Sequence, residues 1–257
     1  MVELVLNNVS KRFGGLLAVD QLNLEVPKGR ILSLIGPNGA GKTTVFNMIT
    51  GVYPPTEGTI AYQGRKLNNL RSHRIISRGI ARTFQNIRLF KSMTVLENVQ
   101  VGMHCRTRSG AFRALFKSSF AIREEKEIIE KALEILEFLG LAEHRNEYAS
   151  NLPYGDQRRL EIARAVATRP QTLLLDEPAA GMNPSETAEL MDLILKLRDT
   201  GLTIFLVEHD MRLVMGISEM VIVLDHGQKI AEGEPKEIQQ NEKVIEAYLG
   251  TKALSQK

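Results

Sequence analysis

The sequence predicts an α/β fold with a parallel core sheet, an antiparallel β region near the N-terminus and a helical insertion. Two observations carry this prediction. Short apolar runs, which suit buried parallel strands, alternate with helical segments in both halves of the chain. Between these halves, residues 88–150 follow a helical pattern. We therefore expect a single domain over residues 1–257, in which residues 1–87 and 157–257 form the core and about 88–156 form a helical subdomain.

The first elements are strands and one helix. Residues 21–26 alternate polar and apolar side chains, as a half-buried antiparallel strand does, and a Pro-Lys-Gly turn follows. Residues 31–35 are a short run without a polar face, which favours a buried parallel strand. A glycine-rich turn then leads into a helix over residues 42–50, which Gly51 closes.

The helical insertion is followed by further strand–helix alternation. Apolar side chains recur at helical spacing over residues 128–139, and Gly140 stops this helix. Asn183 caps a later helix, which has Pro184 at its first position and ends near residue 200. The remaining strands are expected over residues 172–176, 202–207 and 220–224. After the last of these strands we expect only short helices.

The composition is that of a folded globular protein. Apolar residues make up 43% and charged residues 25% of the 257 residues, which excludes a disordered tail, a fibre or a membrane-spanning bundle. No apolar run approaches the roughly 18 residues of a transmembrane helix, and the first residues lack the pattern of a signal peptide. The single cysteine, Cys105, excludes an intrachain disulfide and fits a reducing compartment. These features predict a cytosolic protein.

Residues 36–43 carry the motif that points to chemistry. They read Gly-Pro-Asn-Gly-Ala-Gly-Lys-Thr, which fits G-x-x-x-x-G-K-[ST] between a buried strand and a helix. Glycines let the backbone wrap closely around phosphate oxygens, and the helix N-terminus favours their negative charge. Lys42 would bridge the β- and γ-phosphates of a nucleotide, and Thr43 would ligate Mg²⁺. The alternative is an ordinary glycine-rich turn. The candidate nucleotide-binding residues are Gly36, Pro37, Asn38, Gly39, Ala40, Gly41, Lys42, Thr43 and Thr44.

A second element would supply a metal ligand and a base. Asp176 and Glu177 end a buried apolar strand. Asp176 could hold Mg²⁺ through water, and Glu177 could orient or deprotonate an attacking water. His209 follows a further buried strand and could reach the γ-phosphate. The alternative for each of these three side chains is a purely structural role.

The charge is unevenly distributed along the chain. Residues 58–123 hold thirteen Lys or Arg and one acidic residue, Glu97, a charge of +12 that leaves −9 for the rest of a chain with net charge +3. This distribution indicates a basic face turned toward a nucleotide, a nucleic acid, lipid headgroups or an acidic partner. The alternative is a solvated surface that is balanced by acidic residues elsewhere in the fold.

Along nearly its whole length the chain resembles the ATP-binding subunits of ABC transporters, which are P-loop NTPases. In that family an aromatic at the position of Phe13 stacks on adenine, whereas without the resemblance Phe13 would be a core residue. Gln85, in Thr-Phe-Gln-Asn, resembles the glutamine that senses Mg²⁺ and the γ-phosphate and joins the core to the helical insertion. His209 matches the family's switch histidine, and Asn183 stands where the family usually has an aspartate. The resemblance implies that Lys42, Gln85, Glu177 and His209 are catalytic, and that Thr43, Gln85 and Asp176 bind the metal.

Residues 152–156 depart from the family pattern. They read Leu-Pro-Tyr-Gly-Asp where the family usually has Leu-Ser-Gly-Gly-Gln, a motif that contacts the γ-phosphate held by the partner subunit. The resemblance implies this contact for Tyr154 and Gly155. Without the resemblance, the segment would be interpreted as a turn that opens a helix.

A closer resemblance is to the LivG-type ATPases of branched-chain amino-acid importers. It rests on residues 81–90 (ARTFQNIRLF), 177–184 (EPAAGMNP), 154–161 (YGDQRRLE) and 247–250 (AYLG), and the basic stretch 103–123 also fits this type. It implies an ATPase that uses ATP and Mg²⁺ and drives uptake of leucine, isoleucine or valine through separate permease subunits. The implied partners are a second ATPase subunit, identical or different, the permease and, indirectly, a periplasmic or extracellular solute-binding protein. Such a subunit is cytoplasmic and peripheral on the inner face of the membrane.

Three alternatives remain open. An ABC ATPase for another cargo, such as lipopolysaccharide export, has similar C-terminal residues. A nucleic-acid-associated ABC ATPase would use the basic segment, but only 133 residues without sustained heptads separate Lys42 from Asp176, so no nucleic acid is expected. A P-loop kinase would leave Gln85, His209 and residues 154–155 unexplained.

Overall fold

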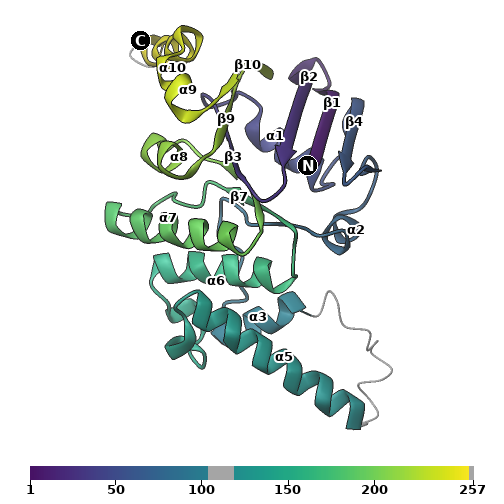
Figure 1. The fold of residues 1–257 in the computed structure, drawn as a ribbon, viewed down its shortest axis with the longest axis vertical. Coiled ribbons are helices and arrows are strands. Elements are labelled where there is room, and N and C mark those ends of the chain that lie inside the picture. Colours follow the sequence, from purple (N-terminus) through teal and green to yellow (C-terminus); the bar gives the residue numbers. More distant parts are fainter. Residues whose placement is uncertain (104–118, 255–257) are drawn as a thin grey trace.

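The structure is a computed structural model and describes residues 1–103 and 119–254. It contains an antiparallel sheet and a mainly parallel sheet, with helices against both (Figure 1). The antiparallel sheet has the order β2-β1-β4-β5, and the other has the order β10-β9-β3-β8-β7-β6. The strands of the first sheet are β1 (Val2–Phe13), β2 (Leu16–Pro27), β4 (Glu57–Tyr62) and β5 (Arg65–Lys66). Those of the second are β3 (Ile31–Ile35), β6 (Ile80–Arg82), β7 (Thr172–Asp176), β8 (Thr203–Val207), β9 (Met220–Asp225) and β10 (Gln228–Gly233).

The central strands of the second sheet are parallel and buried on both faces. β3 pairs with β8 and β9, and β7 pairs with β6 and β8, each pair in parallel. In β7, Leu173 and Leu175 face the helices on one side, whereas Leu174 faces helix α1 (Lys42–Ile49) on the other. Successive side chains of a strand point to opposite faces, so burial of both faces requires an unbroken apolar run. The fold class predicted from these runs is confirmed.

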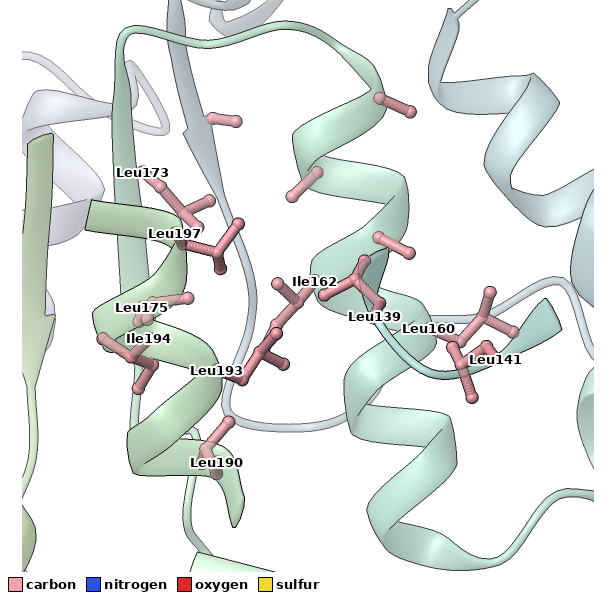
Figure 2. Packing of buried hydrophobic residues seen from close by; sticks show 14 of the residues in the cluster. Leu139, Leu141, Leu160, Ile162, Leu173, Leu175, Leu190, Leu193, Ile194 and Leu197 are labelled. Atoms are coloured by element: carbon pink, nitrogen blue, oxygen red, sulfur yellow. The ribbon is translucent and has the colours of Figure 1, made fainter. Parts of the chain in front are cut away.

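The helices on the far side of the parallel sheet form successive layers (Figure 1). Figure 2 shows α6 and α7 packed against β7 through Ile162, Leu193 and Leu175. Beyond α6 lie α3 and α5, so the helical insertion is continuous with the core of the molecule. These helices are α3 (Val95–Met103), α5 (Ser119–Phe138), α6 (Tyr154–Ala167) and α7 (Pro184–Asp199). No helix among the described residues could span a lipid bilayer.

The remaining helices pack around the second sheet. They are α2 (Ser72–Ser77), α8 (Met211–Ile217), α9 (Pro235–Gln240) and α10 (Glu242–Leu254), with 3-10 turns at Ala142–His144 and Ala149–Asn151. Helix α2 lies beside the edge strand β6, and α9 and α10 lie beside the other edge strand, β10. Helices α8, α9 and α10 enclose a third apolar cluster that includes Ile35, the residue directly before the glycine-rich turn. The C-terminal part of the chain therefore packs against the residue at which that turn begins.

Several local predictions can be compared with the structure. The strands expected over residues 31–35 and 172–176 are confirmed at both ends, and residues 21–26 form half of β2. The expectation of only short helices after residue 224 is wrong, because β10 pairs antiparallel with β9. Its polar sequence, Gln-Lys-Ile-Ala-Glu-Gly, suits a solvent-exposed edge strand and gives no apolar signal. The boundary expected after residue 156 falls in the first turn of α6 and remains a prediction. Cys105 and most of the basic stretch 103–123 lie outside the described residues.

Candidate active site

The glycine-rich turn connects β3 to α1, and two of its glycines cannot be replaced without a clash. Gly36 has φ +148°, and a Cβ there would overlap the carbonyl oxygen of Leu224. Gly41 has φ +101°, and a Cβ there would lie 2.5 Å from the carbonyl oxygen of Ala18. Both positions therefore need glycine for conformation and for space. The turn is shaped by close contact with β2 and β9.

The N-terminus of α1 is available to an anion. No side chain caps this helix, so its first N–H groups keep no intrahelical or side-chain acceptor. Lys42 instead donates from Nζ to the carbonyl oxygens of Gly36 at 2.7 Å and Pro37 at 3.0 Å. Burial lowers the pKa of Lys42, while the carboxylates of Glu177 and Asp176 oppose that shift. The turn thus combines free amide donors with a cation, the chemistry that phosphate oxygens require.

Glu177, Gln85 and His209 come together although they are distant in the sequence. Glu177 follows β7 with φ +47°, and its N–H donates to the carbonyl oxygen of Val207. Gln85 Nε2 donates to Glu177 Oε2 at 2.7 Å. His209 Nδ1 lies 3.8 Å from the same oxygen and has an exposed side chain. One carboxylate oxygen is therefore shared by an amide donor and an imidazole.

A cleft of about 420 Å³ runs from this carboxylate to the glycine-rich turn. It is lined by Phe13, Leu16, Leu17, Ala18, Asn38, Gly39, Ala40, Gly41, Lys42, Thr43, Thr44, Glu177 and His226. Phe13 is 43% exposed, so the core position is excluded. Its ring makes an edge contact with Tyr53 at 5.1 Å, and Lys11 Nζ lies over both rings. An aromatic ring and a carboxylate thus both line this cleft.

Asp176 is buried and forms an ion pair that the sequence did not reveal. Arg82 Nη2 donates to Asp176 Oδ2 at 2.7 Å. Arg82 also donates to Asn47 and Thr50 of α1 and its C-cap, at 2.7 and 3.0 Å. We counted Arg82 with the basic surface, and for this residue the prediction is wrong. It belongs to β6, whose apolar neighbours Ile80 and Ala81 were a signal of burial.

The segment around Tyr154 begins helix α6. Pro153 is the N-cap residue and no side chain caps the helix. The Tyr154 hydroxyl donates to the carbonyl oxygen of Ala180 at 2.8 Å. Gly155 is buried, and a Cβ there would lie 3.4 Å from Glu186 Oε1 of the same chain. An acidic side chain at position 155 would therefore face the Glu186 carboxylate of the same chain, whatever it does to a partner subunit.

Two further buried side chains on α6 were missed in the sequence. Arg158 donates to Glu161 Oε2 at 2.8 Å, and both side chains are almost completely buried. Both contact the loop that carries Gln85. Their spacing of three residues places them on one helix face, which was the only local signal.

The described part of the basic segment is mostly exposed. The exposed cations are Arg65, Lys66, Arg71, Arg74, Arg88, Lys91 and Arg123. No acidic side chain of the described residues forms an ion pair with any of them. These seven charges are therefore not paired locally, and both the basic face and its alternative, balance by acidic residues elsewhere in the fold, remain predictions.

The comparisons with known proteins agree along the chain. A model of the ABC transporter family matches residues 19–180, and a model of branched-chain amino acid ATP-binding cassette transporters matches residues 228–253. The high-affinity branched-chain amino acid transport ATP-binding protein LivG of Salmonella typhimurium is 53% identical over 96% of this chain and 97% of its own. BraF of Pseudomonas aeruginosa, with the same description, is 50% identical over the same shares.

Solved structures of ATP-binding cassettes are also similar to this chain. The ADP conformation of an ATP-binding cassette of an ABC transporter has 36% identity and a TM-score of 0.86, covering 97% of this chain and 99% of that one. A dimeric, post-hydrolysis cassette bound to ADP and Pi has 30% identity and a TM-score of 0.76, covering 90% and 98%. The P-loop kinase alternative is therefore excluded. The chain belongs to the ABC transporter family, as an ATP-binding cassette with ATPase activity.

Proposed function

We propose that this ATPase drives uptake of branched-chain amino acids (leucine, isoleucine or valine) through permease subunits that are separate chains. The cargo is supported by the relatives named above and by the match of residues 228–253, not by the cleft. The cleft has the features of a nucleotide site. The hydrolytic role rests chiefly on one observation, the Gln85–Glu177 contact at the edge of a cleft that also contains Lys42.

ATP would enter with its phosphates against the glycine-rich turn. The uncapped N–H groups of α1 would donate to phosphate oxygens. Lys42 Nζ would exchange the carbonyl oxygens of Gly36 and Pro37 for the β- and γ-phosphates. Phe13 is exposed and lines the same cleft, where its ring could stack on adenine.

The residues near the phosphates also suit Mg²⁺. Thr43, Gln85 and Asp176 offer hydroxyl, amide and carboxylate oxygens, which are the ligands Mg²⁺ prefers. Substrate phosphates would complete the coordination, because Mg²⁺ is usually held by few protein ligands together with phosphate oxygens. When bound, Mg²⁺ would neutralise charge that develops on the phosphates. Arg82 donates a hydrogen bond to Oδ2 of Asp176, which leaves Oδ1 as the oxygen that would face the metal shell.

Glu177 would act as the general base. Its carboxylate oxygen accepts from Gln85, which fixes its orientation, and lies 3.8 Å from His209 Nδ1. A water held between this carboxylate and the γ-phosphate would lose its proton to Glu177. His209 is exposed and could turn toward the γ-phosphate, where an imidazole donor would stabilise negative charge.

A second ATPase subunit would complete the site. The N-terminus of α6 carries no side-chain cap, and the N–H groups of Tyr154 and Gly155 lie in its first turn. Such a helix end favours an anion, here the γ-phosphate held by the partner. Pro153 has neither a hydroxyl nor an N–H, so this contact would depend on backbone amides.

The permease would dock in an apolar groove of about 590 Å³ between the Gln85 loop and the helical layers. Its apolar lining includes Phe84, Leu89, Phe90 and Val101. Arg88 lies over the ring of Phe84 at 4.3 Å, and Arg164 over that of Phe90 at 5.5 Å. This groove suits a short cytoplasmic helix of a membrane subunit, which would place the chain at the inner face of the membrane.

The cargo is tested by uptake into membrane vesicles that contain this chain and its permease and solute-binding subunits. We expect ATP-dependent uptake of leucine, isoleucine and valine and none of an unrelated amino acid such as histidine. ATP-dependent movement of lipopolysaccharide without amino-acid uptake would contradict the proposal.

A further inference from the structure

Two segments that are distant in the sequence meet at the fully buried side chain of Arg158. They are the loop over residues 83–88, which carries Gln85, and the first turns of α6. Arg158 donates to the carbonyl oxygens of Phe84 at 2.7 Å and of Gln85 at 2.8 Å. The guanidinium therefore fixes the backbone at the residue whose side chain contacts Glu177.

Glu161 binds the same loop from the same helix face. One of its oxygens accepts from Arg158 at 2.8 Å. The other accepts from the N–H groups of Phe84 at 3.4 Å and Arg88 at 3.2 Å. The pair thus offers donors to the carbonyls of the loop and acceptors to its amides.

Tyr154 extends this network to the loop that carries Glu177. Its hydroxyl accepts from Arg158 at 3.3 Å and donates to the carbonyl oxygen of Ala180 at 2.8 Å. The Ala180 N–H in turn donates to the carbonyl oxygen of Glu177 at 3.2 Å. With the Gln85–Glu177 contact of 2.7 Å, the hydrogen bonds form a closed ring.

A buried ion pair of this kind adds little stability by itself, because an apolar pair of similar volume is often as stable. A fully connected polar network does fix one geometry. We propose that Arg158, Glu161 and Tyr154 are positioning residues for ATP hydrolysis, which hold Gln85 against Glu177 and join this contact to the first turn of α6. The inference rests on the hydrolytic roles proposed above for Gln85 and Glu177.

Tyr154→Phe in the full-length chain is the mildest test, because it removes one hydroxyl and keeps the backbone N–H. We expect ATP turnover to fall about fivefold, the effect of one lost hydrogen bond, while KM for ATP stays within about twofold. Amide exchange of residues 83–88 should become faster even without nucleotide. Tyr148→Phe is the matched control, since Tyr148 is also an exposed tyrosine of the helical subdomain and lies outside the ring. It should behave as the wild type does.

A double-mutant cycle separates positioning from a general structural effect. In a Gln85→Ala background the Tyr154→Phe change should cost almost nothing further, because the side chain that it positions is gone. Equal fold losses in both backgrounds would overturn the proposal, and so would unchanged turnover and exchange in Tyr154→Phe.

The ion pair is tested by Arg158→Met combined with Glu161→Leu, since either change alone leaves a buried charge unpaired. The double variant should fold with a lowered melting temperature, because backbone groups of the 83–88 loop lose their partners, and it should lose turnover at least about fivefold while keeping KM for ATP. Wild-type turnover in this folded variant would overturn the role of the pair. Glu177→Gln, measured alongside, tests the proposed site itself. If that variant turns over normally, the hydrolytic assignment fails whatever the ring variants do.

Discussion

Lys42 donates to two carbonyl oxygens of its own turn and is largely buried, so it is held where a phosphate would otherwise lie. Burial lowers its pKa below the ordinary value of 10.5. The unfolded chain therefore binds more protons between the lowered pKa and 10.5, and stability rises with pH across that window. Below the window, at neutral pH, the full cost of burying the charged amine is present. The lysine that we propose to bind the phosphates of ATP thus destabilises the nucleotide-free fold.

The first prediction follows from this cost. Without nucleotide, Lys42→Met should raise the melting temperature at pH 7, and its advantage over the wild type should shrink as pH rises toward 10.5. The same variant should lose ATP turnover. Lys28→Met, at an exposed turn position, is the control and should show neither effect. A lower melting temperature for Lys42→Met at pH 7 would contradict the argument.

The residues of the site were predictable to different degrees. The glycine-rich turn was evident because its spacing, the preceding strand and the following helix all lie within one short stretch of sequence. The Gln85–Glu177 contact and the Arg82–Asp176 pair join segments more than ninety residues apart, and the sequence alone indicated both participants of the first contact but only Asp176 of the second. Arg158 and Glu161 carry no motif that distinguishes a buried pair from a surface one.

At the scale of elements, apolar patterning determined what could be predicted. β3 and β7 are buried on both faces, so their ends coincide with the ends of apolar runs. β6 has three residues and β10 is a polar edge strand, so neither produces a periodic signal. β2 is longer than the strand expected over residues 21–26, because bulges in its pairing with β1 interrupt the alternation.

Helix α7 begins with a complete capping box, and this is the basis of the second prediction. The Asn183 side chain accepts from the N–H groups of Ser185 and Glu186, and the Glu186 side chain accepts from the Asn183 N–H. Asn183→Ala should cost about 1 kcal/mol of folding free energy, a fall of about 2–4 °C in melting temperature. Asn183→Asp keeps the acceptor and should keep most of the stability. Equal melting temperatures for the Ala variant and the wild type would show that the cap is dispensable.

At the scale of the molecule, one short loop joins the two proposed surfaces. Gln85 contacts Glu177 beside the cleft, and Phe90, five residues later, lines the apolar groove. Helix α6 contacts this loop between those points. Movement of a permease helix in the groove would therefore reach the hydrolytic carboxylate over a short, hydrogen-bonded path.

The third prediction locates the permease. With Cys105 replaced by Ser, single cysteines at Asn86 or Phe90 should crosslink to a cytoplasmic segment of a membrane subunit. A cysteine at Ile245 is the control, because that side chain is similarly exposed but lies on α10, at the opposite end of the molecule (Figure 1). Crosslinking from Ile245 alone would move the permease to another face. Capture of nucleic acid alone, with binding that falls steeply in salt, would favour the nucleic-acid alternative.

The central claim is that Glu177 is the base of an ATPase whose phosphates lie on the turn before α1. The most direct measurement compares ATP affinity and ATP turnover of Glu177→Gln with those of the wild type, in the full chain assembled with its permease. The amide keeps the shape of the side chain and cannot accept the proton. We therefore predict a loss of turnover of at least ~10²-fold, with ATP affinity nearly unchanged. Turnover at the wild-type rate would contradict the account.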